Sequence, residues 1–143
     1  MEFYSDSGIK RFNLLMSKID AVYHEVALKL GISDSVMLVL YTLCTCNGEC
    51  MLKDIIVGAS KQTINSALRK LELDNIVYLK TFDGRKKKVY LTKKGRELVN
   101  DTVLRVIEAE NDIFSSWSDE ERSIYIGLTQ RYLRDFKTKA KEF

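Results

Sequence analysis

The 143-residue chain has the length of one domain, and its 45% hydrophobic and 30% charged residues are typical of a globular protein. No apolar run approaches the roughly 18–20 residues of a membrane span, and Glu2 and Asp6 interrupt any apolar leader. We therefore expect a cytoplasmic protein. Three cysteines, an odd number, argue against a disulfide framework, and the absence of proline favours a mostly helical fold.

The N-terminal region predicts one long amphipathic helix that ends at residue 31. Apolar side chains recur in steps of three and four from Phe12 onward, and Gly31 stands where a helix commonly ends. Phe3 and Tyr4 precede the helix, and we expect them to dock on a partner chain. A helix this apolar needs a second surface to cover it.

Three shorter elements are expected next. Ser33 is a natural cap for a second helix, which runs to about Cys44 and is apolar nearly all round, as a buried core helix is. Asn47-Gly48 breaks the chain. A short helix from Met51 to Val57 follows, and Gly58-Ala59 makes a tight turn.

Residues 60–95 predict a helix and then two strands joined by a basic turn. Ser60 fits the N-cap, and Asn75 fits the left-handed position after the last helical turn. Asp83-Gly84 is a strong hairpin signal. The helix carries one apolar stripe at helical spacing, made by Ile64, Ala67, Leu68 and Leu71. With the short helix before it, this segment predicts a helix-turn-helix followed by a β-hairpin.

Positive charge is concentrated in the same segment. Residues 60–95 contain ten Lys or Arg and three Asp or Glu, a net charge of +7, whereas the remainder has 13 and 17, a net of −4. The polar face of the helix has no acid before Glu72, and four basic residues follow Gly84 in a row. This asymmetry is typical of a protein that reads nucleic acid.

The C-terminal third predicts two more helices. The first begins near Thr92 and continues for some 25 residues, to about Trp117. Ser118 and Glu121 then form a capping box at the start of the last helix. The two ends of the chain are both amphipathic helices, and the simplest way to bury them is against each other and against a second copy. The residues expected at this interface are Phe12, Leu15, Ile19, Ile124, Leu128 and Tyr132.

A more specific pattern extends over nearly the whole chain. It consists of Ser60-Lys61-Gln62-Thr63, Leu68, Leu71-Glu72, Asn75-Ile76-Val77, Asp83-Gly84-Arg85 and the run from Val89 to Gly95. With these residues the sequence resembles the MarR family of transcriptional regulators, and the wing followed by Leu-Thr-x-Lys-Gly is the most specific part. The resemblance implies a homodimer joined by its terminal helices. It also implies a recognition helix in the major groove and a wing in the minor groove, with Arg85 as the wing-tip arginine. The family's wing commonly has an Asp-Arg pair where this chain has Lys86 to Lys88.

We therefore predict a mainly α fold with a small β-wing. A winged helix-turn-helix DNA-binding domain spans residues 32–98. An N-terminal dimerisation helix at 1–31 and C-terminal dimerisation helices at 99–143 flank it. The predicted function is sequence-specific transcriptional regulation, most simply repression, by a homodimer on a pseudo-palindromic operator with half-sites about 10 bp apart.

The expected DNA contacts divide into two sets. Amide side chains pair well with adenine and Arg with guanine, so the base contacts are expected from Gln62, Asn65, Ser66 and Arg69. Phosphate or wing contacts are expected from Lys61, Thr63, Lys80, Arg85, Lys86, Lys87 and Lys88. The alternative for each residue is a solvated surface position without a ligand.

Two groups of residues are candidates for regulating the protein. Tyr23, His24 and Tyr41 are candidates to line an effector pocket, with ordinary packing as the alternative. The run C-x-C-x3-C places Cys44, Cys46 and Cys50 close in sequence, and a redox role is open to them. A second pair of ligands is missing, and with one His in the chain we expect no metal site.

The enzyme hypothesis has little support, because the sequence lacks a phosphate loop, a nucleophile elbow and paired carboxylates. We expect no cofactor. The expected partners are double-stranded DNA and a second copy of the chain, with an unidentified small-molecule effector as a further candidate and no membrane. The alternatives are a winged-helix adaptor for other proteins and a non-specific architectural DNA binder. An adaptor would be free to carry acids or apolar residues on the outer face of the helix at 60–74.

Overall fold

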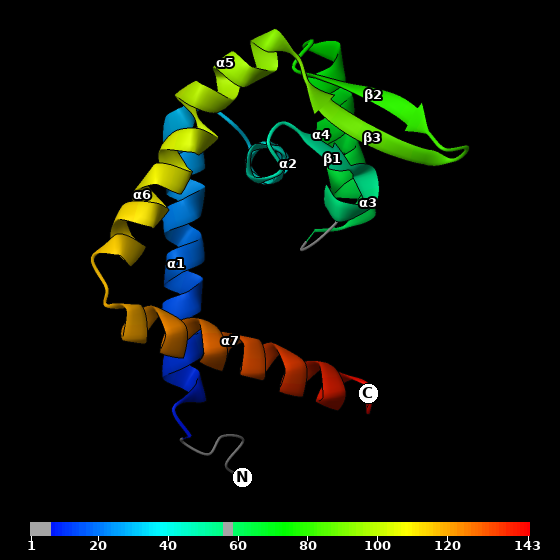
Figure 1. The fold of residues 1–143 in the computed structure, drawn as a ribbon. Helices are drawn as coiled ribbons and strands as arrows, with labels where there is room; N and C mark the ends of the chain where they lie inside the picture. Colours follow the sequence, from blue (N-terminus) through cyan, green and yellow to red (C-terminus); the bar gives the residue numbers. More distant parts are fainter. Residues whose placement is uncertain (1–6, 56–58) are drawn as a thin grey trace. The chain divides into compact units, whose positions relative to one another are not determined.

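The computed structural model describes residues 7–55 and 59–143. It confirms a mainly helical fold with a small antiparallel sheet (Figure 1). The elements are α1 (Ile9–Leu30), α2 (Asp34–Thr45), β1 (Glu49–Met51), α3 (Leu52–Ile55), α4 (Lys61–Leu73), β2 (Val77–Phe82), β3 (Lys86–Leu91), α5 (Lys93–Asp101), α6 (Val103–Ser115) and α7 (Asp119–Ala140). The chain forms two compact units, Met1–Leu104 and Arg105–Phe143.

The first two helices end and begin where the sequence predicts. Gly31 ends α1 in the left-handed conformation, with φ of 73°. The hydroxyl of Ser33 caps α2 by accepting a hydrogen bond from the amide of Val36 at 3.2 Å. Phe3 and Tyr4 lie outside the described residues.

The core of the first unit forms around α2. Val39, Leu40 and Leu43 of this helix are fully buried, as the prediction of a core helix requires. Ile64 of α4 and Val89 of β3 are equally enclosed. Because α2 packs against α4, the helix with the polar outer face is seated directly on the buried core of the first unit.

The sheet differs from the prediction by one strand. Its order is β1-β3-β2, and Cys50 of β1 lies opposite Val89 of β3. The helix predicted from Met51 to Val57 begins only at Leu52, because a turn with positive φ at Asn47 and Gly48 delivers residues 49–51 to the edge of β3. Ile56, Val57 and Gly58 lie outside the described residues.

The long helix predicted from Thr92 to Trp117 is wrong in one respect, since it is broken at Thr102 into α5 and α6. Thr102 has φ −127° and ψ −94°, outside the helical region. Its hydroxyl donates to the carbonyl of Leu98 at 2.6 Å, a local bond by which threonine competes with regular helix.

The second unit contains α7 and most of α6. Ser118 and Glu121 form the predicted capping box, with both hydrogen bonds present. The guanidinium of Arg122 donates to the carbonyls of Phe114 and Trp117 at 2.7 and 2.5 Å, and so closes the end of α6. None of the residues of α7 is buried.

No single helix in the described part of the chain is long and apolar enough to cross a membrane. Among the described residues, α1 and α2 reach that length and hydrophobicity when taken as a pair, and they are bent by 91°.

Candidate nucleic-acid interface

The outer face of α4 carries the residues predicted to read bases. Ser60 caps the helix by accepting from the amide of Thr63 at 3.1 Å, and the apolar stripe predicted from the sequence is buried. The opposite face is a shallow groove, lined by Lys61, Gln62, Asn65, Ser66 and Arg69. All four candidates for base contact therefore lie in one groove, together with one candidate for a phosphate contact.

The side chains of this groove are available to a ligand. Within residues 7–55 and 59–143, none of the five has a hydrogen-bond or ion-pair partner, and only Asn65 is half-buried rather than exposed. Thr63 differs, because its hydroxyl lies 2.7 Å from that of Ser60 and belongs to the helix cap. A row of unpaired donors with no acid among them favours a polyanion or a base edge as the ligand.

The run Leu-Thr-x-Lys-Gly joins the wing to α4. Asn75 takes the left-handed conformation just after α4, with φ of 58°. The hydroxyl of Thr92 lies 2.6 Å from the carbonyl of Asn75 and 3.1 Å from that of Ile76, and it accepts from the amide of Gly95 at 2.9 Å. Thr92 therefore caps α5 and holds α5 to the turn that follows α4.

Gly95 and Lys94 complete this joint. A Cβ at Gly95 would lie 2.1 Å from the carbonyl oxygen of Ile76, so only glycine permits this approach of α5 to the start of β2. The ammonium of Lys94 donates to the carbonyl of Asp74 at the end of α4, at 3.0 Å. The motif that carries the resemblance thus fixes the orientation of α4.

The wing is longer than predicted. Lys86, Lys87 and Lys88 do not lie in the turn but on β3, and the turn itself comprises residues 83–85 and so includes Arg85. Figure 1 shows β2 and β3 as a long hairpin. The sequence predicts a basic turn that holds Arg85 to Lys88, and this is wrong for the three lysines, because their pairing with Phe82, Thr81 and Lys80 of β2 extends the ladder. The low strand propensity of lysine gives no local signal of this pairing.

Strand alternation separates the wing lysines. Lys87 pairs with Thr81 on the face that continues from buried Val89. Lys86 and Lys88 lie on the opposite face, so the basic run is divided between two sides of the sheet.

Two of the predicted phosphate ligands have partners within the chain. The ammonium of Lys88 lies 2.9 Å from a carboxylate oxygen of Glu49 on β1, and this hydrogen bond raises the pKa of Lys88. The ammonium of Lys80 lies 5.6 and 5.9 Å from the ring centroids of Tyr78 and Tyr90, which stack on each other. Lys88 therefore forms an ion pair within the sheet. The sequence does not predict this pair, because Glu49 and Lys88 are far apart in the chain.

Tyr23, His24 and Tyr41, the candidates for an effector pocket, do not line the groove that lies beside α2. The imidazole of His24 lies 2.8 Å from the carboxylate of Asp34 on the protein surface, while Tyr23 and Tyr41 are half-buried. The groove is at the other end of α2, lined by Cys44, Asn47, Gly48, Leu91, Arg96, Val99, Asn100 and Leu104. Arg96 and Asn100 of this groove were not expected from the sequence, because only the fold brings α5 beside the end of α2.

The three cysteines are free thiols. The sulfur atoms of Cys46 and Cys50 are 3.3 Å apart, and Cys44 is half-buried in α2. In the described part of the chain no group of three or more His, Cys, Asp or Glu side chains is arranged to hold a metal ion.

Comparison with known proteins identifies the fold. No protein-family model and no curated protein matches the chain. Among solved structures, a MarR family regulator from Neisseria meningitidis matches with a TM-score of 0.83 and 17% identity, over 95% of this chain and 98% of that one. The fold is that of the MarR-family regulators.

Two further structures connect this fold to DNA. S. aureus MepR, solved as a DNA complex, matches with a TM-score of 0.67 and 20% identity, over 93% of this chain and 98% of that one. Bordetella bronchiseptica BpsR, whose DNA binding is regulated by 6-hydroxynicotinic acid, matches with a TM-score of 0.63 and 19% identity, over 85% and 98%. In the MarR-type fold of this chain, α3 and α4 occupy the helix-turn-helix and β2 and β3 the wing.

Proposed function

We propose that this chain is a MarR-family transcriptional regulator that binds DNA sequence-specifically as a cytoplasmic homodimer, most simply as a repressor. The observation that carries the proposal is the groove along α4, which is lined by five polar side chains and no acid, and where none of the five has a partner among the described residues. The MarR-type fold supports the same conclusion, as does the DNA complex of S. aureus MepR, a protein of similar fold.

The groove residues take different roles in this proposal. Gln62 and Asn65 present amide groups, which pair bidentately with adenine, and Arg69 presents a guanidinium, which pairs with guanine. Each good bidentate pair contributes about 1–3 kcal/mol of discrimination between bases. Ser66 adds a hydroxyl between them, and Lys61 at the start of α4 is placed for a phosphate.

The wing supplies the second set of DNA contacts. Arg85 at the tip is the residue we place in the minor groove, and Lys86 and Lys87 next to it contact the phosphate backbone. Lys80 and Thr63 are exposed and complete the proposed set. Lys88 has a weaker role, because Glu49 already pairs with its charge.

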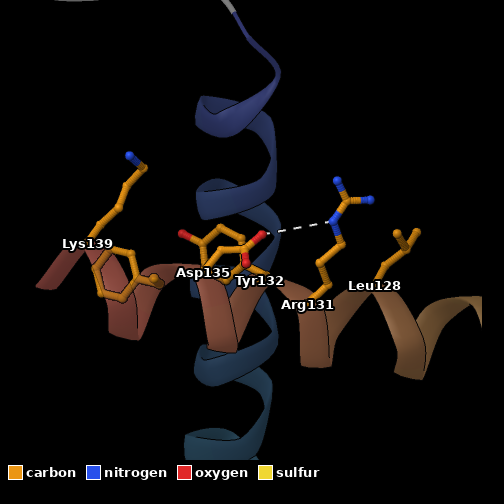
Figure 2. A pocket seen from close by; sticks show the side chains of 6 residues that line it. Leu128, Arg131, Tyr132, Asp135 and Lys139 are labelled. Atoms are coloured by element: carbon orange, nitrogen blue, oxygen red, sulfur yellow. Dashed lines mark ion pairs between the residues drawn. The ribbon is translucent and has the colours of Figure 1, made fainter.

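The homodimer is supported by large apolar side chains that are exposed to solvent on the terminal helices. On α1, Phe12, Leu15 and Ile19 are 41–53% exposed. On α7 the candidates are Ile124, Leu128 and Tyr132, and the last two line a shallow groove with Phe136 (Figure 2). Exposed apolar faces of this extent on two long helices mark an interface, and we assign residues 1–31 and 99–143 to dimerisation and 32–98 to DNA binding.

The ion pairs beside the α7 groove give the interface its polar edge. The guanidinium of Arg131 lies 3.9 Å from the carboxylate of Asp135, and Lys139 lies one turn further (Figure 2). Tyr132 and Phe136 stack with ring centroids 5.9 Å apart. An aromatic centre with a charged rim is the usual composition of a protein interface.

Release from DNA by a small molecule is also part of the proposal. The support is the solved regulator BpsR, whose DNA binding 6-hydroxynicotinic acid regulates.

The test is a binding selection from random duplex DNA at near-physiological salt, with the Arg69→Ala variant selected in parallel. The expected product is a pseudo-palindrome with half-sites about 10 bp apart, degenerate at one position per half-site in the variant. Recovery of only weak, salt-sensitive binding without a consensus would overturn sequence-specific regulation and favour an architectural binder or an adaptor.

A further inference from the structure

Two thiols face each other at the junction between α2 and β1. Cys46 is the C-cap of α2, and Cys50 lies four residues later in β1. The thiol of Cys46 lies 3.3 Å from the sulfur of Cys50. A disulfide bond length is about 2.05 Å, so closure needs an approach of little more than an ångström.

The main chain of the turn holds the two cysteines at this separation. Asn47 and Gly48 both have positive φ, 58° and 90°. The amide of Gly48 donates to the carbonyl of Leu43 at 2.7 Å, and the carbonyl of Gly48 accepts from the amide of Leu91 at 2.9 Å. Gly48 therefore ties the turn to α2 through its amide and to β3 through its carbonyl, and this backbone conformation brings the two sulfur atoms together.

The two sulfurs differ in their access to solvent. Cys50 is 5% exposed, and burial, together with its hydrogen bond to Cys46, raises its pKa to about 12. Cys46 is half-buried, so an oxidant reaches it first. Cys44 lies two residues before Cys46, in the last turn of α2, and burial raises its pKa.

We propose that Cys46 and Cys50 form a reversible disulfide within one chain when the protein meets a hydroperoxide, and that the oxidised form binds DNA more weakly. The second half rests on the proposed function. Cys46 attacks the peroxide oxygen to give a sulfenic acid and one water, or one alcohol from an organic hydroperoxide. Cys50 then attacks the sulfur of Cys46, and a second water leaves. The two thiols lose two electrons and two protons, and the peroxide is reduced.

The location of the pair connects it to both DNA-binding elements. Glu49, between the two cysteines, holds Lys88 of the wing strand, and Cys50 itself pairs with Val89. Leu52 begins α3, the first helix of the helix-turn-helix, directly after β1. Drawing β1 toward the end of α2 therefore shifts α3 and the base of the wing relative to the α2 core, because a packed core transmits such a displacement.

The first arm of the test detects the bond without DNA. The Cys44→Ser variant is treated with hydrogen peroxide, alkylated and cut by a glutamate-specific protease after Glu49, which places Cys46 and Cys50 on different peptides. We expect the two peptides to stay joined and to separate on reduction with dithiothreitol. Separate peptides after oxidation, or joined peptides in a Cys46→Ser variant that retains Cys44, would overturn the assignment.

The second arm measures affinity for the selected operator in reduced, oxidised and re-reduced protein. We expect oxidation to weaken binding about tenfold, which is within the usual range of coupling between two sites, and reduction to restore it. The Cys46→Ser variant should bind equally before and after peroxide. Unchanged affinity of the oxidised wild type would disprove the switch. If the reduced protein selects no operator, both the proposed function and the switch are disproved. The peptide analysis in the first arm still shows whether the disulfide forms.

Discussion

The ammonium group of Lys94 donates a hydrogen bond to the main-chain carbonyl of Asp74, with 3.0 Å between the two atoms. Asp74 is the C-cap of α4, and Lys94 is in the first turn of α5. A positive charge at the end of a helix satisfies a free carbonyl and opposes the helix dipole. The helix proposed to read bases is thus tied to a helix twenty residues further along the chain.

Replacing Lys94 with Ala should loosen the end of α4. We expect a loss of about 0.3–1 kcal/mol of stability, the usual range for a cation at a helix C-terminus. Lys93→Ala is the matched control, because it removes the same charge at an exposed neighbour. Urea denaturation of both variants at one protein concentration measures the difference. Equal stability of the two variants would mean that the bond to Asp74 contributes nothing.

Replacement by alanine should have opposite effects at Gly95, which lies against Ile76, and at Gly127, which has open space around it. Gly95→Ala places a methyl group 2.1 Å from a backbone oxygen, so we expect destabilisation above about 2 kcal/mol. Gly127→Ala meets nothing within 4 Å in α7 and should stabilise the helix by about 1 kcal/mol. Thermal unfolding followed by circular dichroism compares them. A tolerated Gly95→Ala would show that the joint between α5 and β2 can open.

Arg69→Ala should relax sequence preference rather than abolish binding. The guanidinium lines the α4 groove, and losing a bidentate contact to guanine costs about 1–3 kcal/mol on the operator. Affinity for unrelated duplex DNA should fall far less. Lys70→Ala is the control, because Lys70 is the exposed neighbour that does not line the groove. Fluorescence anisotropy titrations on operator and scrambled duplexes measure the specific and the non-specific affinity. An equal loss of affinity for the two duplexes would refute base readout by Arg69.

Adjacent wing lysines should differ in their effect on salt dependence. Lys87→Ala should weaken binding to all DNA and reduce the slope of log affinity against log salt by about 0.9, the value for one phosphate contact. Lys88→Ala should leave that slope nearly unchanged, because Glu49 pairs with its charge. Titrations at several salt concentrations give the slopes. A larger change for Lys88 than for Lys87 would assign the phosphate contact to the other face of the wing.

The capping box of α7 predicts a loss of stability in acid. The carboxylate of Glu121 accepts from the amide of Ser118 at 2.9 Å, and this bond lowers the pKa of Glu121. A lowered folded-state pKa stabilises the fold above the ordinary pKa of glutamate, and the contribution disappears as pH falls through the folded value. Glu121→Gln keeps a hydrogen-bonding side chain without the titration. The stability difference between wild type and Glu121→Gln should therefore shrink from pH 6 to pH 3, and a constant difference would exclude the titration of Glu121 as its source.

Local signals in the sequence predicted several helix boundaries, in both units of the chain. Ser33, Ser60 and Ser118 cap the helices that their positions indicate, and Asn75 adopts the left-handed conformation. These features depend on a few neighbouring residues, so a single sequence contains them. The same is true of the α4 groove, because helical spacing alone places its lining residues on one face.

The features that the sequence did not predict depend on residues distant in the chain. β1 exists because Cys50 meets Val89, and Lys88 is neutralised because β1 brings Glu49 beside it. The break at Thr102 arises from a side-chain hydrogen bond inside an otherwise helical pattern. The proximity of Cys46 and Cys50 likewise depends on the conformation of the turn between them, which their spacing does not specify.

The unequal lengths of the strands have a mechanical consequence for the wing. Near its base β3 is paired on both sides, with β1 and β2, but beyond Lys88 it has only β2 as a neighbour. The base is therefore part of a three-stranded sheet, whereas the tip is a two-stranded ribbon, which twists and bends more easily. The wing is stiff at its root and compliant at its end. In the proposed DNA complex, Arg85 could therefore follow the local width of the minor groove while α4 keeps its register, and the change from stiff to compliant occurs at Lys88, which pairs with Glu49.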